Sequence, residues 1–264
     1  MLKVENLTVT FCDKKEKREV IRDISFEVKA GEIMGVVGES GSGKSVTALT
    51  IMGLLPENAV IEHGIIDFDS NDMVGADIKK LCRIRGNDIC MIFQEPLTCL
   101  NPTVRIGRQV EEVLKLHTDL EKQARKEKVL KSFESVGLKE PERVYNVYPH
   151  QLSGGMRQRV MIAMAVMMEP KLLIADEPTT AIDVTTQRQI LNLIREVSQR
   201  QHMSVLFITH DLKLAQNYCQ RIIVMKDGQI VEGGNADDVF NNPRHEYTKK
   251  LVSSVLKRTG RKEK

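Results

Sequence analysis

The sequence lacks an apolar run long enough to cross a membrane as a helix. Its longest strongly apolar stretch, 160–168, has nine residues, whereas a spanning helix needs about 20. The N-terminus, MLKVENLTV, also lacks the basic and extended apolar regions of a secretory signal. We therefore expect the chain to stay in the cytosol. We also expect it to fold as a globular unit, since 41% of its 264 residues are hydrophobic and can furnish a core.

Cysteine pairs and an excess of one charge are also missing. The five cysteines show no C-x-x-C spacing, so we expect reduced structural thiols rather than a zinc or redox site. The net charge is +3, from 39 basic and 36 acidic residues, and this balance predicts no nucleic-acid partner. Only the last residues, 257–264, are strongly basic, as is common for a solvated terminus.

Strands alternate with helices along much of the chain. Alternating apolar residues over 2–11 and 20–28, separated by a charged turn at 13–19, predict a strand pair. Residues 33–37 predict a strand before a glycine-rich loop, and residues 45–55 predict a helix closed by Pro56. Further strands are expected over 89–93, 172–175, 205–208, 222–224 and 229–232, and a helix over 184–200. The pattern predicts an α/β core with a mostly parallel sheet.

Residues 105–148 are charged and have helical periodicity. They predict an inserted helical lobe in which one helix face carries Val110, Val113, Leu114 and Leu116.

The glycine-rich loop after the strand at 33–37 fits the pattern G-x₄-G-K-[ST]. Its residues are Gly38, Glu39, Ser40, Gly41, Ser42, Gly43, Lys44 and Ser45. Glycines let backbone N–H groups and the following helix N-terminus face phosphate oxygens. Lys44 would reach the β- and γ-phosphates, and the Ser45 hydroxyl would bind Mg²⁺. The loop therefore predicts ATP and Mg²⁺ as ligands.

Two carboxylates end the apolar strand at 172–175. Asp176 and Glu177 would lie at the carboxyl edge of the sheet, where open α/β sheets bind ligands. Asp176 would hold Mg²⁺ through water, and Glu177 would act as the general base that polarises the attacking water.

The segment Leu152, Ser153, Gly154, Gly155 and Met156 resembles the signature motif LSGGQ of the ATP-binding cassette (ABC) family. A Ser-Gly-Gly turn that opens a helix offers N–H groups and a hydroxyl to an anion. In that family the anion is the γ-phosphate held by a second cassette, so the resemblance implies that hydrolysis requires a dimer.

Further positions match the family one by one. Gln94 corresponds to the Q-loop, which would contact Mg²⁺ and water. His210 corresponds to the switch histidine near the γ-phosphate, and Phe11 lies where an aromatic ring stacks on adenine. The D-loop corresponds to Ala181, Ile182 and Asp183.

The resemblance covers residues 1–250 and implies a P-loop NTPase (RecA-like) α/β core with an antiparallel β subdomain and an inserted α-helical subdomain. We expect a nucleotide-binding core over 1–95 and 150–240, the helical subdomain over 96–149, and a C-terminal helix with a basic tail over 241–264. The implied location is the cytoplasmic face of a bacterial membrane. The implied partners are permease subunits, a second cassette that is either a non-identical paralogue or a second copy of this chain and, indirectly, an extracytoplasmic binding protein.

Within the family the motifs are most similar to the importers of oligopeptides, dipeptides and nickel. Residues 242–248, NPRHEYT, resemble the NP-x-HPYT motif of that branch, with Glu246 in place of proline. Many peptide importers continue into a cysteine-bearing extension, which this sequence lacks. We therefore expect nickel or a metal chelate slightly ahead of peptides as cargo.

Two other classes of protein are considered. A soluble ABC ATPase of DNA repair would carry a long coiled-coil insertion, and one acting on the ribosome would carry two cassettes; neither is expected in 264 residues. A P-loop kinase or GTPase would not explain LSGGM, and no N-K-x-D motif is present.

Overall fold

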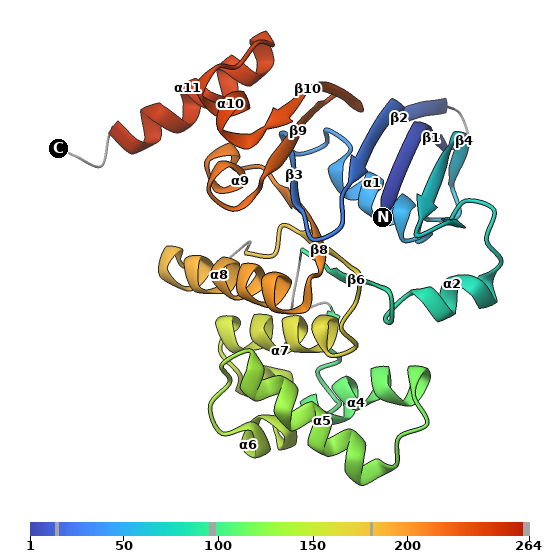
Figure 1. Ribbon diagram of the computed structural model, residues 1–264, viewed down its shortest axis with the longest axis vertical. Helices are drawn as coiled ribbons and strands as arrows, with labels where there is room; N and C mark the ends of the chain where they lie inside the picture. Colours follow the sequence, from blue (N-terminus) through green and yellow to red (C-terminus); the bar gives the residue numbers. More distant parts are fainter. Residues whose placement is uncertain (14–15, 95–98, 180–181, 261–264) are drawn as a thin grey trace. The chain divides into compact units, whose positions relative to one another are not determined.

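The computed structural model describes residues 1–13, 16–94, 99–179 and 182–260 (Figure 1). The chain divides into two compact units. The first comprises Met1–Leu81 and Ser204–Lys264, and the second comprises Cys82–Met203. The chain passes from the first unit to the second within the short helix α2 (Ile78–Ile84) and returns between Met203 and Ser204.

An antiparallel sheet in the first unit forms the predicted β subdomain. Its order is β2-β1-β4-β5, and the strands are β1 (Leu2–Asp13), β2 (Glu16–Val28), β4 (Ala59–Phe68) and β5 (Asn71–Asp72). A bulge interrupts the alternation of β1: Asn6 has φ of 48°, and its side-chain amide donates to the Asp23 carboxylate at 2.9 Å. The bulge brings Leu7 to the buried face only three residues after Val4.

The predicted charged turn over 13–19 is too long. Strand β2 begins at Glu16, and Lys17 and Arg18 still pair with Cys12 and Phe11 of β1. Residues 16–19 are exposed. Both faces of β2 are exposed to solvent at this end of the hairpin. The polar side chains there do not alternate with apolar ones, so the sequence did not indicate where the strand begins.

In the second sheet of this unit, β3 (Ile33–Val37) is an inner strand that runs parallel to both of its neighbours. The order is β10-β9-β3-β8, and the other strands are β8 (Ser204–Thr209), β9 (Arg221–Lys226) and β10 (Gln229–Asn235). Strands β3 and β8 are buried along their whole length, as expected for parallel strands covered on both faces. The helices of this unit, besides α2, are α1 (Lys44–Ile51), α9 (Leu212–Tyr218), α10 (Ala236–Asn241) and α11 (Glu246–Gly260) (Figure 1).

Helix α1 ends at Ile51, four residues before the predicted end at Leu55. Gly53 adopts φ of 62° and its N–H donates to the Thr50 carbonyl at 2.9 Å, while the Leu54 N–H donates to the Leu49 carbonyl at 2.8 Å. A left-handed glycine therefore caps the helix before Pro56 is reached.

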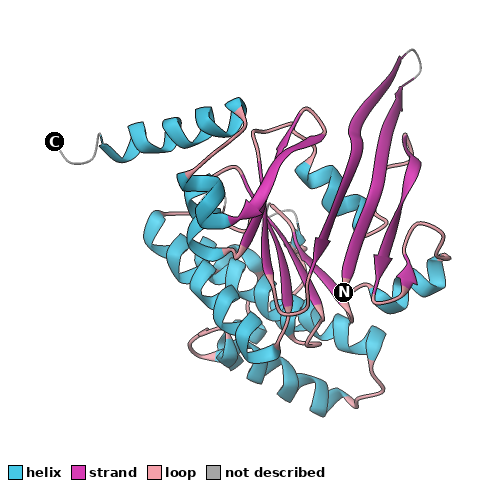
Figure 2. Cartoon of the chain, turned by 45° about the horizontal axis from the view of Figure 1, so that its top comes forward, coloured by secondary structure: helices cyan, strands magenta, loops and turns pink. Residues whose placement is uncertain are grey.

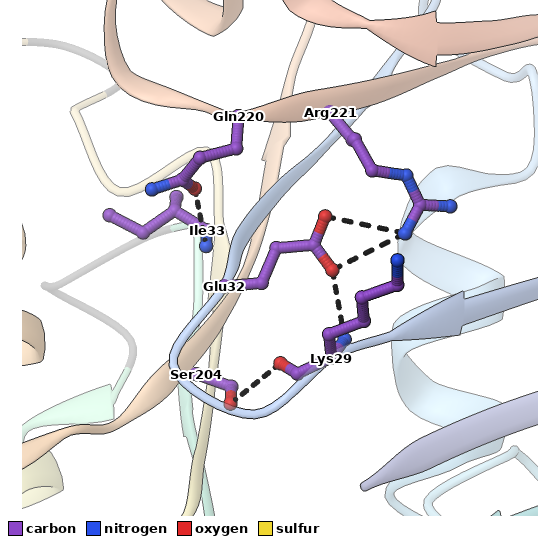
Figure 3. A network of polar contacts seen from close by, with 6 residues as sticks. All are labelled: Lys29, Glu32, Ile33, Ser204, Gln220 and Arg221. Carbon is purple, nitrogen blue, oxygen red and sulfur yellow. Dashed lines mark hydrogen bonds and ion pairs between the residues drawn. The ribbon is translucent and has the colours of Figure 1, made fainter.

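A buried carboxylate fixes the start of β3 (Figure 3). Glu32 accepts the Lys29 N–H at 2.8 Å and lies 3.3 Å from the Arg221 guanidinium of β9. Beside it, the Ile33 N–H donates to the Gln220 side chain at 2.7 Å and the Ser204 hydroxyl donates to the Lys29 carbonyl at 3.1 Å. These bonds connect the turn before β3 with both neighbouring strands.

The second unit holds two parallel strands and a group of helices. Figure 2 distinguishes the helices and strands of the chain by colour. Strand β6 (Ile89–Ile92) pairs with β7 (Leu172–Asp176). The helices are α4 (Ile106–His117), α5 (Lys122–Ser135), α6 (Pro141–Asn146), the 3₁₀ turn η1 (Pro149–Gln151), α7 (Gly154–Val166) and α8 (Val184–Gln201). Helices α4, α5 and α6 lie within the range 96–149 that was predicted to be helical, although its role as a separate subdomain stays a prediction.

The predicted apolar face of α4 is partly wrong. Val110 and Leu114 are fully buried, but Leu116 is 74% exposed. Positions four apart share one helix face, and a residue six positions after Val110 lies on another face. Ile106, four residues before Val110, completes the buried stripe instead.

Among the residues that the structure describes, no helix has the length and apolar character needed to span a bilayer.

The predicted fold class is confirmed, because the structure has the α/β core, the antiparallel sheet and the helical insertion.

Replacing Glu32 with Ala should lower the free energy of unfolding by about 2–4 kcal/mol, because the Lys29 N–H and the Arg221 guanidinium both lose a buried carboxylate. Urea unfolding followed by circular dichroism measures the change. Arg143→Ala is the control, since it removes an ion pair with Glu140 of 3.0 Å whose two side chains are largely exposed, and it should shift the midpoint little. Equal shifts in both variants would contradict the role given to Glu32.

Candidate functional site

The glycine-rich loop lies between β3 and α1, as the sequence predicted. Gly41 and Gly43 have φ of 81° and 105°, in the left-handed region that side chains with a Cβ rarely adopt. Gly43 is also closely packed, since an added Cβ would lie 2.7 Å from the Ile21 side chain. Gly41 has nothing within 4 Å of such a Cβ, so its backbone dihedral rather than its packing favours glycine.

Lys44 is bound to its own loop. Its ammonium donates to the Gly38 carbonyl at 2.8 Å and to the Glu39 carbonyl at 2.9 Å, and the residue is only 5% exposed. The loop therefore curls around the lysine and holds its charge at the N-terminus of α1.

The serines of the loop differ in burial. Ser40 is exposed and Ser45 is half-buried, whereas Ser42 is buried and its hydroxyl has no hydrogen-bond partner among the described residues. The Ser42 carbonyl accepts the Gly228 N–H from the turn between β9 and β10 at 3.1 Å. This contact of the turn with the loop was not predicted, although the K-D-G sequence indicated the turn itself.

Two more predicted site residues lie in the first unit. Phe11 is half-buried on β1, opposite Arg18 of β2 and Ala59 of β4. His210 is exposed and directly follows β8. The next residue, Asp211, caps α9 by accepting the N–H groups of Lys213 and Leu214 at 2.8 and 3.1 Å, so a strand end and a helix start fix the backbone on both sides of His210.

In the second unit, Asp176 is the last residue of β7 and Glu177 follows it, so the two acids end the strand as predicted. Asp176 is 4% exposed. Glu177 has φ of 44°, a conformation that a residue with a Cβ adopts at a cost and that is frequent at functional sites. The amide of Gln94, which follows β6, donates to the Glu177 carboxylate at 3.4 Å. Two predicted catalytic residues are therefore brought together at the ends of neighbouring strands.

The signature segment and the D-loop also meet in this unit. Ser153 caps α7, accepting the Met156 N–H at 3.3 Å, and Asp183 caps α8, accepting the Thr186 N–H at 2.9 Å. This bond from Thr186 lowers the pKa of Asp183, so the cap stays ionised. A Cβ on Gly155 would lie 2.8 Å from the Thr186 methyl group, which shows how closely the two helix starts approach. Ala181 of the predicted D-loop lies outside the described residues.

The predicted site residues thus fall into two groups. The loop 38–45, Phe11 and His210 belong to the first unit, and Gln94, Asp176, Glu177, the signature segment and Asp183 belong to the second. Besides the turn at Gly228, sequence reasoning missed Tyr247, which also contacts the loop. The hydroxyl of Tyr247 on α11 accepts the Glu39 N–H at 3.0 Å. Its place in the motif at 242–248 was the only signal.

Comparison with known proteins places these features in a family. The family model for ABC transporters matches residues 21–180. The chain is 49% identical to the dipeptide transport ATP-binding protein of Haemophilus influenzae, over 97% of this chain and 77% of that protein. It is 46% identical to the oligopeptide transport ATP-binding protein of Bacillus subtilis, over 97% of this chain and 72% of that protein.

A solved structure agrees with this assignment. A dimeric ATP-binding cassette in a post-hydrolysis state, bound to ADP and Pi, superposes with a TM-score of 0.80 and is 30% identical, over 89% of this chain and 99% of that one. The predicted family and ATPase activity are confirmed, and the alternative of a DNA-repair or ribosomal ATPase is not favoured. The chain therefore belongs to the ABC transporter family, as a subunit that binds and hydrolyses ATP.

Proposed function

We propose that this subunit binds ATP·Mg²⁺ at the loop 38–45 and drives the import of di- or oligopeptides through membrane permeases. The observation that carries the ATP site is the loop itself, with left-handed glycines between β3 and α1 and a buried lysine at its centre. The cargo rests on the names of the relatives described above.

Binding would use groups that the loop already orients. The two carbonyl bonds of Lys44 hold its ammonium where the β- and γ-phosphates of a nucleotide on the loop would lie. The backbone N–H groups of Gly41 and Gly43 would be offered to the phosphates, whereas the Ser42 N–H donates to the Glu39 carbonyl at 3.2 Å. Phe11 would stack on the adenine ring from β1.

The residues proposed for Mg²⁺ all supply oxygen. These are the Ser45 hydroxyl, the Gln94 amide oxygen and the Asp176 carboxylate, and oxygen is the ligand that Mg²⁺ prefers. Asp176 fits this role because the end of β7 holds it buried. The bound ion would neutralise phosphate charge during hydrolysis.

For hydrolysis, Glu177 is the proposed general base. The backbone turn at φ of 44° orients its side chain, and Gln94 contacts the carboxylate. The Glu177 carboxylate would accept a proton from the attacking water, Gln94 would position that water, and His210 would donate to the γ-phosphate.

The signature segment would act on the ATP of a second cassette. Ser153, Gly154 and Gly155 begin α7, where N–H groups and the helix dipole attract an anion. Asp183 would contact the same partner from the start of α8. The subunit would therefore work as one of two cassettes on the cytoplasmic face of the membrane, with permeases and, indirectly, an extracytoplasmic binding protein.

The peptide cargo proposed here differs from the cargo expected from the sequence, which slightly favoured nickel or a metal chelate over peptides. That preference rested on the missing cysteine extension after Thr248. The relatives are longer than this chain, which covers 77% and 72% of them, so where the sequence ends does not distinguish the cargoes. Both relatives are named for peptide transport, and neither name mentions nickel.

Glu177→Gln should reduce ATP hydrolysis at least about 100-fold, because the amide cannot take a proton from water. It should leave ATP binding intact. Lys44→Ala should instead weaken binding, because the phosphates lose their cation. Equilibrium binding of a fluorescent ATP analogue and phosphate release, measured on the same preparations, separate the two effects.

Glu169→Gln is the matched control for Glu177→Gln. Glu169 lies in the same unit, also has a left-handed φ, of 54°, and is exposed, so the two variants share the chemical change and a similar backbone. Glu169→Gln should hydrolyse ATP normally. Normal hydrolysis by Glu177→Gln, or an equal loss in both variants, would contradict the role of Glu177 as the base.

Deleting the gene should abolish uptake of a labelled tripeptide or dipeptide and leave ⁶³Ni²⁺ uptake under metal limitation unchanged. The Glu169→Gln gene should restore peptide uptake, while the Glu177→Gln gene should not, because transport needs hydrolysis. Loss of nickel uptake with normal peptide uptake would reverse the assignment of cargo.

A further inference from the structure

One peptide group of the phosphate loop is held from both sides. The carbonyl of Gly38 and the N–H of Glu39 belong to the same planar peptide. The carbonyl accepts from Lys44 at 2.8 Å, and the N–H donates to the Tyr247 hydroxyl at 3.0 Å. Rotating this peptide would break both bonds, so Tyr247 fixes the orientation of the carbonyl that holds the lysine.

Tyr247 reaches the loop from the distant C-terminal part of the chain, 208 residues after Glu39. It lies in the first turn of α11 and is 7% exposed, and the next residue, Thr248, is 0% exposed. The ammonium of Lys226 lies 5.4 Å from the centre of the Tyr247 ring. Burial raises the pKa of Tyr247 above its ordinary value, so its hydroxyl stays neutral at physiological pH.

The backbone before α11 is fixed as well. The Glu232 carboxylate of β10 accepts the N–H groups of Arg244 and His245 at 2.8 and 3.0 Å. The Tyr247 N–H donates to the His245 ring nitrogen at 3.1 Å. The start of α11 is therefore attached to β10, and the Tyr247 side chain is presented to the loop in a defined place.

We propose that Tyr247 is a positioning residue for the phosphate loop, through which the segment 242–260 sets the affinity for ATP. The inference rests on the proposed binding of ATP at this loop. Tyr247 bonds to the second residue of the loop, whereas the phosphates would bind the N–H groups nearer Lys44, so the hydroxyl supports the loop without competing for nucleotide. It has no role in the proton transfer assigned to Glu177.

The hydroxyl alone is therefore expected to affect binding more than turnover. A hydrogen bond of this kind contributes about 0.5–1.5 kcal/mol, which corresponds to about a two- to tenfold change in an equilibrium constant. Because this hydrogen bond is only partly buried, water can replace the lost acceptor, and the fold should survive. Loss of the hydroxyl would then act mainly on the loop, because the Gly38–Glu39 peptide could rotate more freely.

The test is Tyr247→Phe in the full chain, with whatever second cassette gives saturable ATPase activity in the wild type. The ring and its contact with Lys226 remain, and only the hydroxyl is removed. KM for ATP and the Kd of a fluorescent ATP analogue should rise about two- to tenfold, while kcat stays within about twofold of the wild type. Without nucleotide, the Glu39 amide should also exchange its hydrogen faster, because its acceptor is gone.

Tyr145→Phe is the matched control. It removes a hydroxyl that donates to Glu111 at 2.6 Å in the helical part of the second unit. It should lower thermal stability without changing KM, Kd or exchange in the loop. A rise in KM for both variants would overturn the inference in favour of general destabilisation.

Two further outcomes would overturn it. Unchanged KM and Kd in Tyr247→Phe would do so even if the Glu39 amide exchanged faster, because the bond would then not affect binding. A fall in kcat at constant KM would show that the hydroxyl acts on turnover instead. If the wild type neither binds nor hydrolyses ATP, the proposed ATP site itself is wrong. If the wild type is active and the Tyr247→Phe variant has the same KM and Kd, only the role given to Tyr247 is wrong.

Discussion

The structure of the phosphate loop depends on the bonds between the Lys44 ammonium and the two carbonyls at Gly38 and Glu39. A buried ammonium needs acceptors, and the loop supplies them from its own backbone. To turn these carbonyls toward the lysine, the chain must curl back immediately after β3, and the left-handed φ values of Gly41 and Gly43 make that curl possible. One electrostatic requirement thus determines both the glycine positions and the start of α1. The same curl directs the following N–H groups toward the place where phosphates would bind.

Strand β3 carries the loop, and it is fixed at both ends. At its start, Glu32 joins the Lys29 backbone to Arg221 of β9 (Figure 3). At its end, the loop is held by the Gly228 N–H and the Tyr247 hydroxyl. Both groups come from residues after β9, so the C-terminal part of the chain contributes to the geometry of a loop near its beginning. A site of this kind needs its contacting residues held by a second layer, because a small displacement of a phosphate-binding group costs much of its effect.

The sequence predicted those parts that depend on local patterns. The glycine loop, the acids at the end of β7 and the helix start after Ser153 all follow from short-range rules, and the apolar runs within β3 and β8 indicated buried parallel strands. Non-local contacts were not predictable in this way. Strand β4 was missed because its burial depends on pairing with β1. The contact of Tyr247 with Glu39 joins residues with no shared periodicity. The early end of α1 was missed for a different reason, since Gly53 was a local signal that the apolar residues beyond it outweighed.

The second unit carries the segments through which this cassette would act on the nucleotide of a second one. Ser153 and Asp183 cap two helices that start close together, with Gly155 packed against Thr186. Both caps accept N–H groups of their own helices, and the first residues of α7 are glycines. Such a surface attracts an anion. A γ-phosphate held by the loop of another cassette would supply that anion, and closure of the two cassettes would then depend on the nucleotide itself. Hydrolysis in that other cassette would remove the phosphate from between them, so loss of a single bond would let the two protein surfaces separate.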